Sequence, residues 1–255
     1  MTERTFVSQT SGPIVLGLSL PVGEIHVQVC EDLTTARVVL RTEDTTGPAA
    51  DAVERARSRQ NGQAFGIEVP EMPGNVMVQS VRGNRVVQTA GTVYGSVTGM
   101  TIINGRVVTG GSTMQTVSPI VATVLLPARS SLAVVTTSAD AHVFGYVDRL
   151  EFRSVSGGLN ADGVRELTAN TTSGDIEVGR VSERVTARSV SGDVGLRLYS
   201  GQDADLNTTS GDVDVTATDA ASGFLRAHSV SGDVRLSGTR HLRVSADSVS
   251  GRVRR

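Results

Sequence analysis

The chain has 255 residues, a formal net charge of −2, 38% apolar residues and 28 glycines. The near-neutral charge argues against a general electrostatic attraction to nucleic acid or to an anionic membrane. No stretch approaches the ~18 apolar residues needed to span a bilayer. All 24 basic residues are arginine, and Cys30 is the only cysteine, so no internal disulfide can form. High glycine with a modest apolar fraction favours many short strands joined by tight turns.

The printed N-terminus, Met1 to Phe6, lacks the basic start and the apolar stretch of a secretion signal. We therefore expect a cytoplasmic protein. Membrane or envelope association has no support in this part of the sequence.

Residues 1–71 predict a β-rich cap with one short helix. Between residues 12 and 42, apolar and polar residues alternate with period two, as in antiparallel strands. Residues 48–60 predict the helix, which begins at Pro48 and ends before Asn61. The chain then returns to strand.

Residues 72–118 predict a β-hairpin segment of different composition. Gly83-Asn84 and Asn104-Gly105 are two-residue turn signals between β-branched runs. No aspartate or glutamate occurs between Met72 and Ala139, and four of the five methionines lie in residues 72–118. A β-rich stretch without acids is expected to be a contact surface, either buried or paired with another chain.

The second half of the chain repeats, and the repeat determines the predicted fold. A Ser-Gly turn recurs at intervals of 17, 18, 19, 21 and 19 residues. Its serines are Ser156, Ser173, Ser191, Ser210, Ser231 and Ser250. Apolar residues recur three positions after each serine, and mostly apolar ones at four and six positions before it. Serine or threonine recurs two positions before it and is expected to bond backbone groups at the corner.

A repeat of about 19 residues is too short for a helical hairpin and holds two or three short strands. We therefore predict a parallel β-solenoid over residues 119–255, in which stacked coils place equivalent residues ~4.8 Å apart. An antiparallel sandwich is the competing architecture, but it would not need the same residue type in each column.

The turn glycines and the aspartates that follow them form the clearest chemical pattern. The column contains Gly157, Gly174, Asp175, Gly192, Asp193, Gly211, Asp212, Gly232, Asp233 and Gly251, with Asp140 further upstream. We expect the glycines to need positive φ and the aspartates to bond backbone N–H groups. Calcium binding is the alternative, but a single file offers one carboxylate per coil where a hard cation needs several oxygens. The sequence therefore predicts a structural column, with no metal and no cofactor.

No catalytic pattern is recognisable. No serine lies in a Gly-x-Ser-x-Gly turn, no phosphate-binding loop occurs, and the four histidines are scattered in the sequence. Polysaccharide-cleaving β-helices need two acids that converge across a cleft, whereas these aspartates repeat as turn residues. We expect no enzyme. Aromatic residues make up 3%, and we expect Phe144, Tyr146 and Phe152 to fill the first full coil.

The run from about residue 130 to 255 contains Ser-Val-Ser-Gly-Asp-Val and Thr-Thr-Ser-Gly-Asp-Ile turns. With the opening Pro-Val-Gly-Glu-Ile-His-Val at residues 21–27, it resembles the bacterial domain family known as putative adhesin. The resemblance covers most of the chain except residues 72–118. It implies a β-solenoid, often in proteins linked to the bacterial envelope, and it implies no catalytic residues.

A stack of coils needs a cap or exposes strand edges. We expect residues 1–71 to cap one end. The other end is rich in arginine, and its possible interface comprises Arg235, Arg240, Arg243, Arg252, Arg254 and Arg255. These charges either protect the edge from aggregation or dock on a partner, and Arg252 could pair with Asp233.

We therefore predict a non-catalytic scaffold or interaction protein that self-associates through the solenoid ends or the hairpin segment. Its partner would be a second copy or another protein, and not nucleic acid. The alternative is an adhesin-like module that recognises an envelope glycan or an anionic surface.

Overall fold

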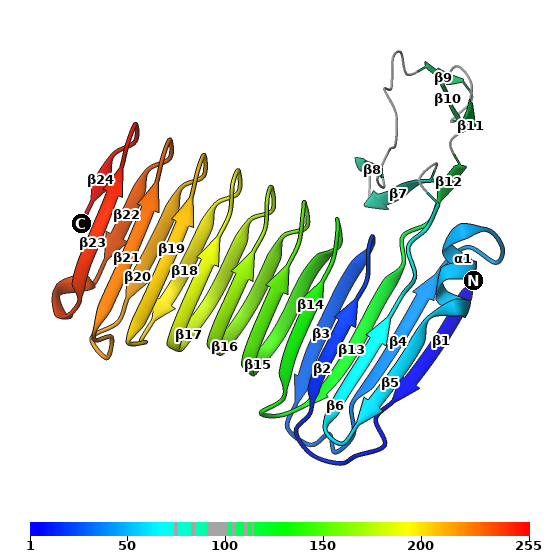
Figure 1. The fold of residues 1–255 in the computed structure, drawn as a ribbon, viewed down its shortest axis with the longest axis horizontal. Helices are drawn as coiled ribbons and strands as arrows, with labels where there is room; N and C mark the ends of the chain where they lie inside the picture. The colour runs from blue at the N-terminus through cyan, green and yellow to red at the C-terminus, as the bar shows by residue number, and fades with distance from the viewer. Residues whose placement is uncertain (74–75, 83–84, 91–100, 104–105, 110–111, 114) are drawn as a thin grey trace.

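A computed structural model describes residues 1–73, 76–82, 85–90, 101–103, 106–109, 112–113 and 115–255. These residues form one long stack of coils, with a short helix at the N-terminal end and a smaller group of strands beside it (Figure 1). The predicted fold class, an all-β parallel solenoid of about 19-residue coils with one short helix, is confirmed. No helix in the described part of the chain is long and apolar enough to span a bilayer.

The solenoid is an 18-stranded sheet folded into two layers, and each coil contributes one strand to each layer. Layer A runs in the order β1 (Thr2–Val7), β4 (Arg37–Thr42), β13 (Val121–Pro127), β3 (Glu24–Cys30), the first halves of β15 (Asp140–Arg153), β16 (Leu159–Asn170) and β17 (Ile176–Arg188), then β18 (Val194–Tyr199), β20 (Val213–Ala217), β22 (Val234–Ser237) and β24 (Val253–Arg254).

Layer B runs in the order β5 (Arg57–Asn61), β6 (Ala64–Glu68), β2 (Val15–Ser19), β14 (Ser131–Val135), the second halves of β15, β16 and β17, then β19 (Asp203–Thr208), β21 (Phe224–Ser229) and β23 (Arg243–Ser248). The Ser-Gly turns join layer B to layer A along one edge of the stack. The opposite edge, where layer A bends back into layer B, is called the bend edge here.

The core lies between the two layers and is built from the predicted apolar columns. In layer A the column Leu159, Ile176, Val194, Val213 and Val234 pairs strand to strand in register. All five side chains are buried. Because parallel strands stack equivalent residues directly over one another, a coil buries the same positions as its neighbours, and the sequence must repeat.

The N-terminal strands β2 and β3 lie inside the stack. Strand β3 pairs in parallel with β13 and β15, and β2 pairs in parallel with β14 and β6. The predicted antiparallel pairing over residues 12–42 is therefore wrong for β2 and β3, and it holds only for β4 against β1 and β13. The alternation of apolar and polar residues indicates that one face of a strand is buried, but it does not indicate whether the neighbouring strand is parallel or antiparallel.

Helix α1 (Pro48–Arg55) is shorter than the predicted 48–60, because Arg57–Asn61 forms β5 and pairs with β6. Gly62, with φ 58°, makes the turn between these two strands instead of ending the helix. The helix buries its alanines and Val53 and packs against β1 and β4.

The segment 72–118 contains the predicted hairpins. Strand β7 (Val76–Arg82) pairs antiparallel with β8 (Arg85–Ala90), and β9 (Thr101–Ile103) pairs antiparallel with β10 (Arg106–Thr109). Two short strands complete the segment, β11 (Ser112–Thr113) beside β10 and β12 (Gln115–Val117) parallel to β7. The turn residues themselves, 83–84 and 104–105, lie outside the described residues. The division of the chain at residues 71 and 119 stays a prediction.

Candidate functional site

The turn glycines lie against the backbone of the preceding coil. A Cβ built on Gly211 would be 2.6 Å from the carbonyl carbon of Gly192 and nearer still to its oxygen. The same overlap occurs at Gly157, Gly174, Gly192, Gly232 and Gly251. All six glycines are described, and none has φ in the left-handed region. The predicted positive φ is therefore wrong, and glycine is required because the stacked turns approach so closely.

Hydroxyl groups hold these turns together, as predicted. The Ser229 hydroxyl accepts a hydrogen bond from the Gly232 N–H (2.8 Å) and donates one to the Gly211 carbonyl of the preceding coil (2.9 Å). Thr171, Ser189, Thr208 and Ser248 repeat this double contact. Each hydroxyl therefore satisfies one donor and one acceptor that stacking would otherwise leave buried without a partner.

The aspartates cap the following coil. Asp212 Oδ1 accepts a hydrogen bond from the Asp233 backbone N–H at 2.7 Å, and Asp233 Oδ1 accepts one from the Arg252 N–H at 2.9 Å. The carboxylates of Asp140, Asp175 and Asp193 make the same bond to the next coil. The expected bond to backbone N–H groups is thus present, but it runs between coils instead of within one turn.

The guanidinium that meets this column is that of Arg235, and not that of Arg252. It lies 2.9 Å from Asp212 and 3.0 Å from Asp233. The Arg252 backbone N–H, followed by the charges of Arg235 and Arg252, lowers the pKa of Asp233, and the bond to Asp212 raises the pKa of Arg235. The described residues contain no group of three or more potential ligands placed to hold a metal ion.

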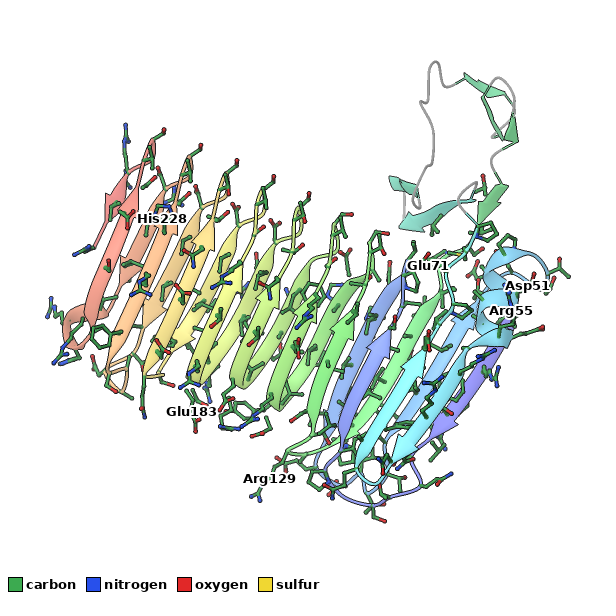
Figure 2. The ribbon with its side chains drawn as sticks, in the orientation of Figure 1. Asp51, Arg55, Glu71, Arg129, Glu183 and His228 are labelled. Carbon is green, nitrogen blue, oxygen red and sulfur yellow. The ribbon has the colours of Figure 1, made fainter. Side chains whose placement is uncertain are left out.

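Arg165, which no motif in the sequence marks, forms ion pairs that link three neighbouring strands at the bend edge. Its guanidinium lies 2.6 Å from Asp148, 2.7 Å from Glu166 and 2.6 Å from Glu183. Glu183 projects at this edge in Figure 2. The hydrogen bond from Arg165 lowers the pKa of Asp148 and raises that of Arg165 itself. These four side chains form ion pairs with one another, so the cluster stabilises the contact between neighbouring coils.

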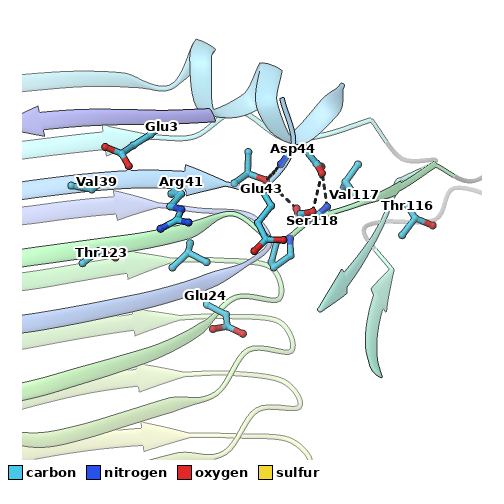
Figure 3. Close-up of a pocket in the computed structure, with 13 residues that line it drawn as sticks. Glu3, Glu24, Val39, Arg41, Glu43, Asp44, Thr116, Val117, Ser118 and Thr123 are labelled. Carbon is cyan, nitrogen blue, oxygen red and sulfur yellow. Dashed lines mark hydrogen bonds between the residues drawn. The ribbon is translucent and has the colours of Figure 1, made fainter. Parts of the chain in front are cut away.

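An open cleft of about 740 Å³ lies where the segment 72–118 rejoins the stack (Figure 3). Glu3, Glu24, Arg41 and Glu43 are among its lining residues. At its end the Asp44 carboxylate accepts hydrogen bonds from the Ser118 N–H (2.9 Å) and hydroxyl (2.8 Å). Asp44 therefore anchors the returning chain at Ser118.

The structure brings two of the scattered histidines together. His26 and His142 stack on neighbouring strands, with ring centroids 5.3 Å apart. His228 pairs with Asp247 at 2.6 Å. Spacing along the chain could not reveal these pairs, because they are formed across strands.

The arginines of the predicted interface lie in several elements at the C-terminal end of the stack, and their role as an interface stays a prediction. Arg235 lies in layer A, Arg243 lies in layer B, and Arg240 lies in the short 3₁₀ helix Thr239–His241. Arg254 lies in β24, and Arg255 donates a hydrogen bond to the Ala246 carbonyl.

Only one of the three aromatics expected in the core is there. Phe152 is fully buried, but the side chains of Phe144 and Tyr146 are 51% and 42% exposed. Gly145, with φ 91°, interrupts the register of β15 between them. The Tyr146 hydroxyl instead lies 2.6 Å from that of Ser182, across the surface of the bend edge.

A third exposed aromatic, Phe224, lies in a groove of about 510 Å³ on layer B. Its side chain is 57% exposed, and the Arg243 guanidinium lies 5.3 Å from its ring centroid. No prediction from the sequence includes this groove, although the repeat contains a signal for it. Among the six full coils, the position seven residues before the turn serine is aromatic in one, at Phe224. In the other five it is charged, as Arg149, Glu166, Arg184, Asp203 and Arg243.

Solved structures share this fold. A putative adhesin from Bacteroides fragilis is 11% identical with a TM-score of 0.51, and the match covers 99% of this chain and 96% of that one. A putative lipid binding protein from Parabacteroides distasonis is 13% identical with a TM-score of 0.50, covering 100% and 97%. At such identities the likeness shows the fold alone. No curated protein matches the chain.

The family comparison is more specific than these structural likenesses. The model of the family described as Toastrack DUF4097 matches residues 51–254, which is most of the chain and includes every Ser-Gly turn. The resemblance to the putative-adhesin family, first suggested by those turns, is confirmed. The chain belongs to the Toastrack family.

Proposed function

We propose that this chain is a non-catalytic binding scaffold. The observation that supports the proposal is the mutual pairing of charges on the coil faces. In layer B, Arg149 lies 3.1 Å from Glu166, and Arg184 lies 3.4 Å from Asp203. Further pairs are Arg153–Glu151, Arg188–Asp205 and Arg197–Glu177. Catalysis needs polar groups that are free to meet a substrate, and here they are largely occupied by their neighbours.

The shape of the stack also suits a scaffold. Each coil contacts only the coils beside it, so the chain extends in one direction and presents long, regular faces (Figure 1). Such faces can engage an extended partner at several coils at once. The similar solved structure named as an adhesin supports an interaction role in the same way.

Self-association is the more specific part of the proposal, and the hairpin segment is its first candidate interface. The absence of acids over residues 72–139 favours contact with another surface. Sedimentation velocity tests this with the full chain and with a variant in which residues 79–113 are replaced by a Gly-Ser linker. The variant keeps the pairing of Val78 with Val117, both of which are buried.

We expect the full chain to sediment as an oligomer and the shortened variant to sediment as a monomer. Replacing Arg252, Arg254 and Arg255 with Glu is the matched test of the arginine-rich end. A full chain that stays monomeric at every concentration and salt would refute self-association.

Recognition of an envelope glycan or an anionic surface is the second candidate function. The exposed ring of Phe224, which shares a groove with Arg226 and Arg243, favours this function. Elsewhere on this layer arginines pair with carboxylates of neighbouring coils, whereas these two have no carboxylate partner among the described residues and are available to a ligand.

A further inference from the structure

The charge pairing of layer B is interrupted at one coil. The residues seven positions before each turn serine form a column along layer B. In this column Arg149 pairs with Glu166, and Arg184 pairs with Asp203. The next member of the column is Phe224, whose side chain is 57% exposed. One exposed aromatic residue is ordinary on a protein surface, so its neighbours decide whether it forms part of a site.

Those neighbours are arginines without carboxylate partners. Arg226 lies in register between Asp205 and Ser245, but Asp205 already pairs with Arg188 at 3.5 Å. Arg226 therefore forms no ion pair with any residue that the structure describes. Within the same described set, the one contact of the Arg243 guanidinium is its stack on the Phe224 ring.

The three side chains line the groove of about 510 Å³ over β21 and β23. Asp203 and Ser245 also line the groove, and its base is the sheet backbone at Ala204, Leu225 and Val244, because the side chains of Ala204 and Leu225 are buried in the core. The groove lies on the outer surface of a sheet and does not enclose its contents. A pocket for a small molecule usually buries most of its ligand, so this shape suits a segment of a polymer that lies across the strands.

The chemistry of the groove indicates the class of polymer. A guanidinium binds a carboxylate through two parallel N–H···O bonds, and an aromatic ring offers an apolar surface to the C–H groups of a sugar ring. The Ser245 hydroxyl can bond a sugar hydroxyl. The neighbouring carboxylates of Asp203, Asp205 and Asp247 repel a polyanion in proportion to its charge density. They therefore disfavour a densely charged polyphosphate more than a polysaccharide with at most one carboxylate per sugar. One exposed phenylalanine is too little apolar surface for docking on lipid.

We propose that the groove over β21 and β23 binds a carboxylated polysaccharide. Phe224 packs against a sugar ring, and Arg226 and Arg243 bind its carboxylate. This proposal rests on the second candidate function above and names its ligand class and site. It is independent of self-association.

Isothermal titration calorimetry on the full chain tests the proposal, with an oligogalacturonate as the carboxylated probe and its methyl ester as the neutral probe. We expect the acid to bind and the ester to bind at least tenfold more weakly. Phe224→Ala and Arg226→Gln should each weaken binding of the acid at least tenfold. Phe144→Ala and Arg180→Gln are the matched controls, because both side chains are exposed and lie outside the groove. Neither control should change the affinity.

The proposal is overturned if the acid does not bind, if acid and ester bind equally, or if the groove and control variants behave alike. It is also overturned if vesicles containing phosphatidylglycerol retain the chain while the oligogalacturonate does not bind. Thermal melting checks that the variants fold. Should Phe224→Ala prove unstable, Arg226→Gln decides the outcome, because its side chain has no described bond to lose. Sedimentation tests self-association separately, so either proposal can fail while the other stands.

Discussion

Replacing Gly211 with alanine should destabilise the solenoid through contact between coils. The new Cβ would lie 2.6 Å from the Gly192 carbonyl carbon. Carbon atoms in contact prefer about 3.5–4.0 Å. The two turns must therefore separate by about 1 Å to admit one methyl group. The backbone angle contributes nothing to this cost, because φ at Gly211 is not left-handed.

The separation stretches three hydrogen bonds that join the two coils. These are Thr208 Oγ1 to the Gly192 carbonyl (3.1 Å), Asp212 N–H to Asp193 Oδ1 (2.7 Å) and Ser210 N–H to the Val190 carbonyl (2.8 Å). An increase of about 1 Å takes all three beyond hydrogen-bonding distance. Each bond contributes about 0.5–1.5 kcal/mol. After the gain of about 0.4–1 kcal/mol from a stiffer unfolded chain is subtracted, the net loss is about 1–4 kcal/mol.

Urea denaturation followed by far-UV circular dichroism measures the loss. Because each coil contacts only its neighbours, amide hydrogen exchange should show the coils around Gly211 opening first. Gly17→Ala is the matched control, since it lies in a strand of the same sheet and a Cβ there would meet nothing within 4 Å. We expect the control to change stability by less than about 0.5 kcal/mol. The reasoning is refuted if Gly211→Ala is equally neutral, or if the control is equally harmful.

Three further predictions concern side chains, and a fourth concerns bound cations. Asp212→Ala should cost about 1 kcal/mol in urea denaturation, because the Asp233 N–H loses its acceptor, whereas Asp212→Asn keeps an oxygen and should cost less. Tyr199→Phe should leave stability unchanged or raise it by up to about 1 kcal/mol, because the buried hydroxyl has no hydrogen-bond partner among the described residues; a clear loss would reveal one. The hydrogen bond from Arg165 lowers the pKa of Asp148, so this pair stabilises the fold while the carboxylate is charged, and the deficit of Asp148→Asn measured at pH 7 should shrink in acid, as the pH falls below the usual range of an aspartate carboxyl. A chelator should not shift the melting temperature, whereas a cation bound at 100 times its dissociation constant would contribute about 2.7 kcal/mol.

The coil architecture could be predicted from the sequence because stacking imposes it residue by residue. A position such as Val194 is buried directly over Ile176 and under Val213, so the same residue type recurs at one point in every repeat. The turn hydroxyls recur for the same reason. The aromatic at Phe224 was equally visible as a break in a charged column, although its significance was not.

Other features depended on which strands meet in space. Strands β2 and β3 carry the same alternation as antiparallel strands, and only their neighbours, β14 and β15, made them part of the parallel stack. Residues 57–60 have helix-forming side chains, but pairing with β6 made them a strand. In both cases a partner distant in sequence outweighed the local pattern.

The sequence by itself determined the repeat, its length and the stacking of coils, because those follow from burying identical columns. It left two or three strands per coil open, and the structure shows two layers. Only the tertiary structure decided why the turn glycines are needed, which charges are paired and which are left free. Those properties depend on distances of a few ångströms between coils 17 to 21 residues apart in the chain. An arginine is available to a ligand only when no neighbouring carboxylate pairs with it. Arg226 and Arg243, beside Phe224, could therefore be recognised only after the ion pairs of the other layer B residues had been assigned from the structure.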